Sequence, residues 1–118
     1  MRINNFPIFA GQTINASANS EPIWLGHAFG YSIQITPTGT AAGTAVLQLS
    51  DDDGGDFDTT NPPTVTNWIT ITGTSQAVSG TTSIAWNISD VQYRWARVSY
   101  THTSGSSTFN ARVNTKGF

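Results

Sequence analysis

The last third of the chain decides the fold, because three segments follow one another there: TSIAWNI (82–88), YRWARVSYTH (93–102) and STFNARVNT (107–115). Every second residue of each segment is apolar, and such a period of two places one set of side chains in a core and the other in solvent. The set that we expect to face the core is Ile84, Trp86, Ile88, Ala96, Val98, Tyr100, Phe109, Ala111 and Val113. The pattern predicts three consecutive β-strands.

The same alternation recurs upstream, in residues 29–36, 44–50 and 67–72, and no helical pattern competes with it. In the last of these segments Ile69 and Ile71 are the expected core residues. Short strands separated by turn signals are typical of a sandwich or a barrel. We therefore expect an all-β, single-domain antiparallel β-sandwich over residues 1–118, jelly-roll-like and with about eight strands. An immunoglobulin-like strand order is the alternative, since alternation does not encode connectivity.

The amino-acid composition excludes several classes of binding partner and site. Charged residues make up only 10% of the 118 residues, against about 25% in an average soluble protein. The net charge of −2 gives no basic footprint for nucleic acid or an anionic membrane. The absence of cysteine excludes disulfides and cysteine-type zinc sites. No apolar run approaches a membrane span, and the first residues lack the apolar stretch of a signal peptide, so we expect synthesis in a cytoplasm.

One long polar stretch, DDDGGDFDTTNPPTVT (51–66), is predicted to be a loop. Clustered carboxylates could supply the oxygens that calcium requires, but no glutamate stands at the closing position of an EF-hand. A solvated loop with aspartate and glycine at its turns explains the pattern and is the favoured interpretation. We expect no bound metal or other cofactor. The acidic residues of this loop are Asp51, Asp52, Asp53, Asp56 and Asp58.

Catalytic machinery is not apparent in the sequence. The only two histidines, His27 and His102, have no second histidine, glutamate or cysteine at ligand spacing. No nucleophile elbow is present. The carboxylates outside the loop, Glu21 and Asp90, do not form the pair that a glycosidase needs. We therefore expect a protein that is not an enzyme and has no catalytic residues.

The tryptophans and one arginine are the best candidates for a contact surface. Trp68 and Trp95 are out of phase with the expected core residues beside them, so both should lie on the outer face of a sheet. Large apolar groups in such positions mark contact surfaces. Arg97 shares the phase of Trp95, and an arginine beside an outward tryptophan favours a cation–π contact. A subunit interface is the favoured interpretation; a sugar-binding platform of Trp24, Trp68 and the 51–66 loop is the alternative.

The beginning of the chain is predicted to form an arm or first strand. Residues 1–20 combine a polar, asparagine-rich start with the short apolar segment FPIF (6–9), which is too short to form a core alone. We expect Phe6, Ile8 and Phe9 to contact a neighbouring subunit.

The region from about 31 to 118 resembles a group of small structural proteins of tailed bacteriophages. The segments that carry the resemblance are YSIQIT (31–36), VLQLSDD (46–52), NWITITGTSQAVSG (67–80), SIAWNISD (83–90) and YRWARVSYTHTSGSSTFNARVNTKGF (93–118). Such proteins are β-sandwich virion components, either head decoration (cement) proteins or tail-associated proteins, and they are often trimeric. The resemblance carries no catalytic residues.

What the resemblance implies for this chain is a virion structural protein. We expect a homotrimer that stabilises the head by bridging major capsid proteins, or that binds another virion protein. The residues expected at its interfaces are Phe6, Ile8, Phe9, Trp24, Trp68, Trp95 and Arg97. The alternative is a carbohydrate-binding or adhesin-like module of a phage tail or surface structure. Head, neck and tail positions stay open, and the number of copies per particle would separate them.

Overall fold

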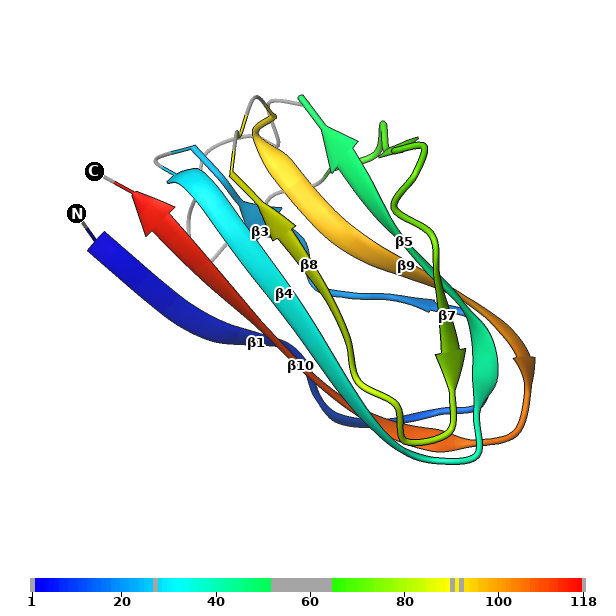
Figure 1. Ribbon diagram of the computed structural model, residues 1–118. Coiled ribbons are helices and arrows are strands. Elements are labelled where there is room, and N and C mark those ends of the chain that lie inside the picture. Colours follow the sequence, from blue (N-terminus) through cyan, green and yellow to red (C-terminus); the bar gives the residue numbers. More distant parts are fainter. Residues whose placement is uncertain (1, 27, 52–64, 90, 92, 118) are drawn as a thin grey trace.

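The chain folds into two antiparallel sheets packed face to face (Figure 1). The computed structural model describes residues 2–26, 28–51, 65–89, 91 and 93–117, and of residues 2, 3, 4 and 6 it describes the backbone alone. The first sheet, sheet A, has the order β1-β10-β4-β8. Its strands are β1 (Arg2–Ile14), β10 (Ser107–Gly117), β4 (Ala28–Gly39) and β8 (Ile84–Ile88).

The second sheet, sheet B, is built around two long central strands, β9 and β5, which pair with each other. Two short strands, β2 and β3, pair with the free side of β9, and two more, β6 and β7, pair with the free side of β5. The bounds are β2 (Ala18–Asn19), β3 (Ile23–Trp24), β5 (Ala42–Ser50), β6 (Ile69–Thr70), β7 (Gln76–Ser79) and β9 (Trp95–Ser104).

The pairings identify the topology as a jelly roll. The chain behaves as one long antiparallel ribbon, in which β1 pairs with β10, β2 and β3 with β9, β4 with β8, and β5 with β6 and β7. Wrapping this ribbon brings β10 beside β4 and β5 beside β9, which completes the two sheets. In an immunoglobulin fold the first strand pairs with the second, whereas here it pairs with the last. The predicted β-sandwich is confirmed, with the jelly-roll order.

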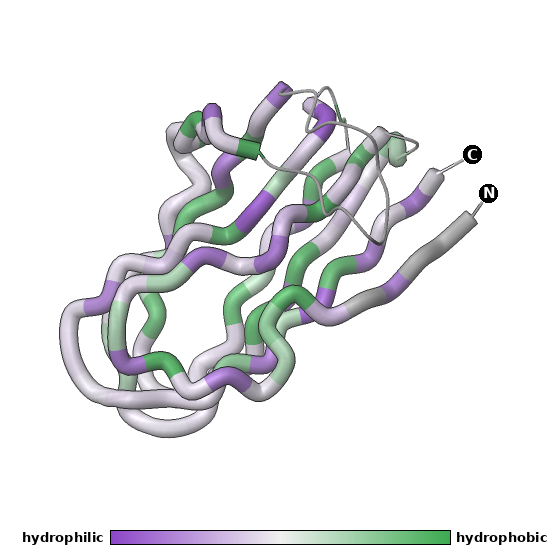
Figure 2. Tube along the Cα trace, turned by 180° about the vertical axis from the view of Figure 1, so that it is seen from behind, coloured by the Kyte–Doolittle hydropathy of each residue, from purple (hydrophilic) through white to green (hydrophobic). Residues whose placement is uncertain are grey.

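The core lies between the sheets and follows the predicted alternation. Hydrophobic and hydrophilic positions alternate along the strands (Figure 2), and the residues predicted to face inward in the last third are buried or, for Ile88, packed against the core. At its centre the rings of Phe9 and Phe109 meet edge to face at 5.8 Å, and those of Tyr100 and Phe109 at 5.1 Å. Such edge-to-face pairs add stability beyond the burial of area.

Strand β1 is an integral part of sheet A. It pairs with β10 from Arg2 to Ile14, and both Ile8 and Phe9 are buried in the core. Consecutive residues face the same core because the register shifts between Pro7 and Phe9, where a β-bulge inserts Ile8 as an extra residue. This differs from the expected N-terminal arm: Ile8 and Phe9 contact the chain's own core, and the side chain of Phe6 lies outside the described residues.

One further expectation about the core is wrong. Ile69 was expected inside, yet 55% of its side chain is exposed. It pairs with Leu49 in the short strand β6, at the margin of sheet B, where Leu49 itself is only partly buried. An inward phase does not by itself bury a residue at the margin of a sheet, because burial also depends on what distant parts of the chain place over that residue.

Candidate functional site

Four of the predicted contact residues come from one region on the outer face of sheet B. Trp95 and Arg97 alternate along β9 with the buried residues Ala96 and Val98, so they are directed away from the core. Trp24 on β3 is the direct cross-strand partner of Trp95. Trp68, just before β6, is brought to Arg97. We call Trp24, Trp68, Trp95 and Arg97 the outer-face cluster.

Arg97 is the centre of this cluster. Its guanidinium carbon lies 4.4 Å from the centroid of the Trp68 ring, which is the cation–π contact expected for this arginine. Its Nε donates a hydrogen bond of 2.7 Å to Oε1 of Gln48, the residue opposite it on β5. Burial lowers the pKa of Arg97 from its usual value, but arginine stays charged at neutral pH. The guanidinium is thus fixed in place by a ring and an amide.

The same contacts tie three strands together. Nε2 of Gln48 donates to Oγ1 of Thr70 on β6 at 3.0 Å, and Nε1 of Trp68 donates to the carbonyl oxygen of Val65 at 3.1 Å. A continuous line of contacts therefore runs from β9 through β5 to β6 and the segment before it. Side chains whose hydrogen-bonding groups are all paired in such a network keep a single conformation, so this part of the surface is rigid.

The other two tryptophans of the cluster are more covered than expected. Trp95 is directed outward by its phase, yet only 2% of it is exposed, and it lies outside the main core cluster. The expectation of a wet, outward Trp95 is therefore corrected. Trp24 is half-buried, and its indole lies where a side chain at Gly26 would stand, 2.4 Å from an added Cβ. Glycine at position 26 lets this ring lie flat against the chain.

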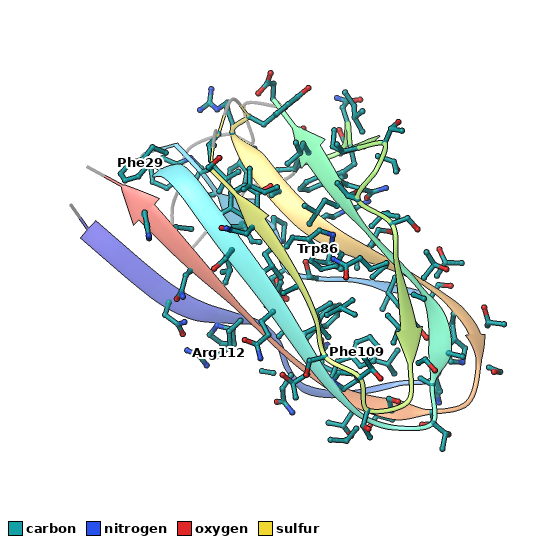
Figure 3. The ribbon with its side chains drawn as sticks, in the orientation of Figure 1. Phe29, Trp86, Phe109 and Arg112 are labelled. Atoms are coloured by element: carbon teal, nitrogen blue, oxygen red, sulfur yellow. The ribbon has the colours of Figure 1, made fainter. Side chains whose placement is uncertain are left out.

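Trp86 has the core position that its phase predicted. It lies buried between the two sheets (Figure 3). Its Nε1 donates a 2.8 Å hydrogen bond to the carbonyl oxygen of Thr74. The indole N–H therefore has a partner inside the protein, as buried tryptophans require.

The outer face of sheet A has a different chemistry. Its outward positions carry mainly asparagine, serine, threonine and glutamine, with Arg112 and Lys116 as cations. Nε of Arg112 donates to Oδ1 of Asn5, and Nδ2 of Asn5 donates to Oδ1 of Asn114. The face is therefore polar, carries these two positive charges and is internally hydrogen-bonded.

A hollow of about 450 Å³ lies on this sheet, near the start of β4 and the ends of β8 and β10. Phe29 at its edge is 39% exposed (Figure 3). The lining residues are Phe29, Gly30, Tyr31, Ser32, Asn87, Ile88, Ser89, Asn114 and Lys116.

The sequence did not single out this hollow or the role of Gln48. Both depend on residues that are distant in sequence and meet only through strand register. Alternation within a strand carries no information that Gln48 on β5 and Arg97 on β9 are partners. The exposure of Phe29 follows from a register shift between Lys116 and Gly117, which leaves Phe29 as the extra residue of a bulge.

The histidines and the acidic stretch give no sign of a metal site where the structure describes them. The hydroxyl of Tyr100 and Nδ1 of His102 share a 2.9 Å hydrogen bond. Oδ1 of Asp51 accepts a hydrogen bond from the backbone N–H of Arg94 at 3.2 Å. His27, Asp90 and the acidic residues between 52 and 58 lie outside the described residues. In the described part, no group of three or more metal-binding side chains occurs, and no helix is long and apolar enough to cross a membrane.

Comparisons with known proteins show a shared fold. No protein-family model matches the chain, and no curated protein does. The structure is similar to that of the SPBc2 prophage-derived protein YomS, with a TM-score of 0.59 at 14% identity over 96% of this chain and 93% of that one. PirA gives 0.49 at 15% identity over 97% and 93%. Infectious bursal disease virus, Gx strain, gives 0.47 at 8% identity over 98% of this chain and 32% of that chain.

Proposed function

We propose that this chain is a non-enzymatic structural protein of a bacteriophage virion, and specifically a capsid decoration protein that oligomerises and bridges major capsid proteins. The observation that carries the proposal is the rigid surface on sheet B. Arg97 holds the Trp68 ring in place on the outer face, and the next residue, Ile69, is exposed at the margin of the same sheet, on the side of its partner Leu49. A fixed aromatic, an arginine and an exposed aliphatic side chain are the residue types that protein interfaces select.

The fold supports this proposal. Jelly rolls are a recurrent architecture of viral capsid proteins, and the similarity to a prophage-derived protein is in keeping with a phage origin. A compact sandwich without cysteine has no need of an oxidising compartment. Burial of the sheet B surface against a neighbour would add stability in the assembled particle.

The sheet B surface favours a protein partner over the sugar platform considered as the alternative. Sugar stacking needs an open aromatic face, but Arg97 occupies one face of the Trp68 ring. Trp95 is buried, and Trp24 lies against Gly26. A neighbouring protein can instead contact the outer face together with the margin of the sheet, where the aliphatic side chain of Ile69 is exposed.

The first test is the assembly of the purified protein. We expect a homotrimer in analytical ultracentrifugation, and we expect Ile69→Arg to weaken its association. Burial of the exposed part of this isoleucine contributes about 1 kcal/mol. An unpaired arginine buried in its place adds a desolvation cost, so the dissociation constant should rise at least tenfold. Thr38→Arg is the matched control, because it adds the same charge at an exposed position of sheet A. A monomer at all concentrations, or dissociation by Thr38→Arg alone, contradicts the proposed interface.

The second test is the copy number per particle, measured by quantitative mass spectrometry of purified virions. Hundreds of copies are expected for a protein that decorates the head. Tens of copies or fewer would place it at the neck or tail, and absence from the particle would reject a virion role. Particles made with Ile69→Arg should carry fewer copies than those made with Thr38→Arg.

A further inference from the structure

We propose that the hollow on sheet A is a saccharide-binding site. It lies on the opposite sheet from the outer-face cluster, so it is independent of the interface proposed above. Its volume of about 450 Å³ is within the usual range of small-ligand sites, roughly 300–1,000 Å³. The proposal rests on how the register builds the hollow, on the chemistry of its lining, and on its aromatic edge.

The register explains why the sheet is hollowed at this place. Ser32 on the central strand β4 pairs with Asn114 on β10 and with Asn87 on β8. These three outward side chains form a row across three strands, with the shortest in the middle. Two residues before Ser32, on the same face of β4, Gly30 pairs with Lys116 and has no side chain at all. Short residues on β4 between longer residues on both neighbours leave a trough along β4.

Glycine at position 30 keeps the floor of the trough open. A Cβ added there would lie 3.1 Å from the carbonyl oxygen of Ile88 and 3.7 Å from Cα of Ser89. A side chain would therefore both fill the trough and press on the end of β8. The two strands that flank β4 lie about 10 Å apart, twice the usual strand spacing, and this leaves room for a single sugar ring between their side chains.

The lining has the hydrogen-bonding character that sugar hydroxyls require. Asparagine and serine side chains each both donate and accept, as a hydroxyl group does. The polar lining side chains are Ser32, Asn87, Ser89, Asn114 and Lys116. Only one of them carries a charge, so the site suits a neutral polyhydroxylated ligand better than a phosphate, which would require clustered cations.

One of these side chains is held in a fixed orientation. Oδ1 of Asn114 accepts from Nδ2 of Asn5, whose own oxygen accepts from Arg112. With its oxygen engaged, the Asn114 amide keeps its Nδ2 donors for other partners. A donor that is already oriented loses less entropy when it binds a ligand.

The edge of the hollow supplies an apolar surface. The bulge at Phe29 places its ring beside the trough, partly exposed (Figure 3). The face of an aromatic ring carries negative charge density, and the C–H bonds on one side of a sugar ring are weakly positive. An aromatic ring beside a set of neutral amides and hydroxyls is therefore complementary to both sides of a sugar.

The test is binding to bacterial glycans and to simple sugars. One arm uses an array of bacterial capsular and O-antigen polysaccharides. The other follows the ¹H–¹⁵N spectrum, including the side-chain amides, during titration with D-glucose, D-galactose, N-acetyl-D-glucosamine and D-glucuronate. We expect at least one sugar to bind with a dissociation constant on the order of millimolar and to shift the amide signals of Asn87 and Asn114. Binding on the array alone would assign the site to longer chains.

Variants decide whether the hollow itself is responsible. Asn87→Ala and Phe29→Ala should each weaken binding about tenfold. Asn110→Ala is the matched control, because Asn110 is an exposed asparagine on β10 outside the hollow. Binding that is equally strong in all variants, shifts confined to Trp24 and Trp68, or no binding in either arm would each overturn the proposal. Trimer formation should be unaffected by these variants, so the two proposals fail separately.

Discussion

Tyr31 is a single core residue that makes the stability of the fold depend on pH. Its side chain faces the core from β4 and is only 4% exposed. Burial raises the pKa of its phenol from 10.0 to about 12, because the charged phenolate is poorly solvated inside the sandwich. The folded state therefore holds the phenol proton more tightly than the unfolded chain does.

The consequence is a loss of stability at high pH. Below about pH 10 the phenol is protonated in both states, so its contribution is fully present, and it is lost as the pH rises through about 12. Burial also raises the pKa of Tyr100, so both tyrosines contribute to the loss of stability at high pH. A variant that lacks the Tyr31 hydroxyl is needed to separate the two contributions. We expect urea denaturation, followed by tryptophan fluorescence between pH 9 and 11.5, to show a shallower decline for Tyr31→Phe than for the wild type. Parallel declines would contradict the assignment to Tyr31.

At the residue scale, alternation predicted the direction of side chains better than their exposure. It placed Trp86 inward and Trp68 outward, as the structure has them. It also directed Trp95 outward, yet that residue is buried. It directed Ile69 inward, yet that residue is exposed. Phase is local, whereas exposure depends on what distant parts of the chain cover, and no short stretch of sequence contains that information.

The turns between strands depend on glycines with positive φ, and two of them differ usefully in their surroundings. Gly73, between β6 and β7, has φ +87° and no other atom within 4 Å of an added Cβ. Gly105, between β9 and β10, has φ +78°, but its Cβ would lie only 2.3 Å from the carbonyl oxygen of Thr40. The first position is limited by backbone conformation alone, and the second also by steric contact.

Alanine substitutions should separate these two effects. Gly73→Ala is expected to cost about 1–2 kcal/mol of unfolding free energy, the usual penalty for an L-residue in the left-handed region. Gly105→Ala should cost clearly more, because backbone atoms must also move apart. Equilibrium denaturation in guanidinium chloride measures both values, and an unchanged slope would confirm that the native state is retained. Equal losses for the two variants would show that the turn at Gly105 relaxes freely.

At the element scale, the strongest strands were predictable and the interrupted ones were not. The three C-terminal segments agree with β8, β9 and β10 to within about two residues at each end. Gly11 follows the FPIF segment and has the sequence signal of a strand break, but the structure shows it to be a bulge with φ +69° inside a continuous β1. A glycine that breaks a strand and a glycine that bulges it have the same sequence signal.

The whole molecule shows why connectivity lay beyond sequence reasoning. The first and last strands of the ribbon lie side by side, with the two termini close together at one end (Figure 1). Their pairing joins residues that are between 93 positions apart, for Ile14 with Ser107, and 115 positions apart, for Arg2 with Gly117. Periodicity indicates which side of a strand is apolar, but it does not indicate which other strand lies beside it. The candidate surfaces were equally hidden, since the pairing of β5 with β9 and β6 creates one and the pairing of β4 with β10 and β8 creates the other.

This closure makes a prediction about the N-terminal segment. Removal of residues 1–10 would take most of β1 from sheet A, together with Ile8 and Phe9 of the core. Truncation of two such side chains alone typically costs about 5–10 kcal/mol, which is comparable to the whole stability of a small domain. We therefore expect the shortened chain to lose cooperative thermal unfolding, measured by circular dichroism.

Two full-length variants separate the loss of the core from the loss of a contact arm. Ile8→Ala with Phe9→Ala should reproduce most of the destabilisation, while Asn5→Ala with Pro7→Ala, at exposed positions of the same strand, should unfold close to the wild-type temperature. If the shortened chain unfolds cooperatively at the wild-type temperature but no longer binds capsids, the result would support the original expectation of an N-terminal contact arm. If the shortened chain is instead unfolded, its failure to bind capsids follows from the loss of the fold. Without β1, strand β10 has no neighbour on its outer side, and the core lacks Ile8 and Phe9.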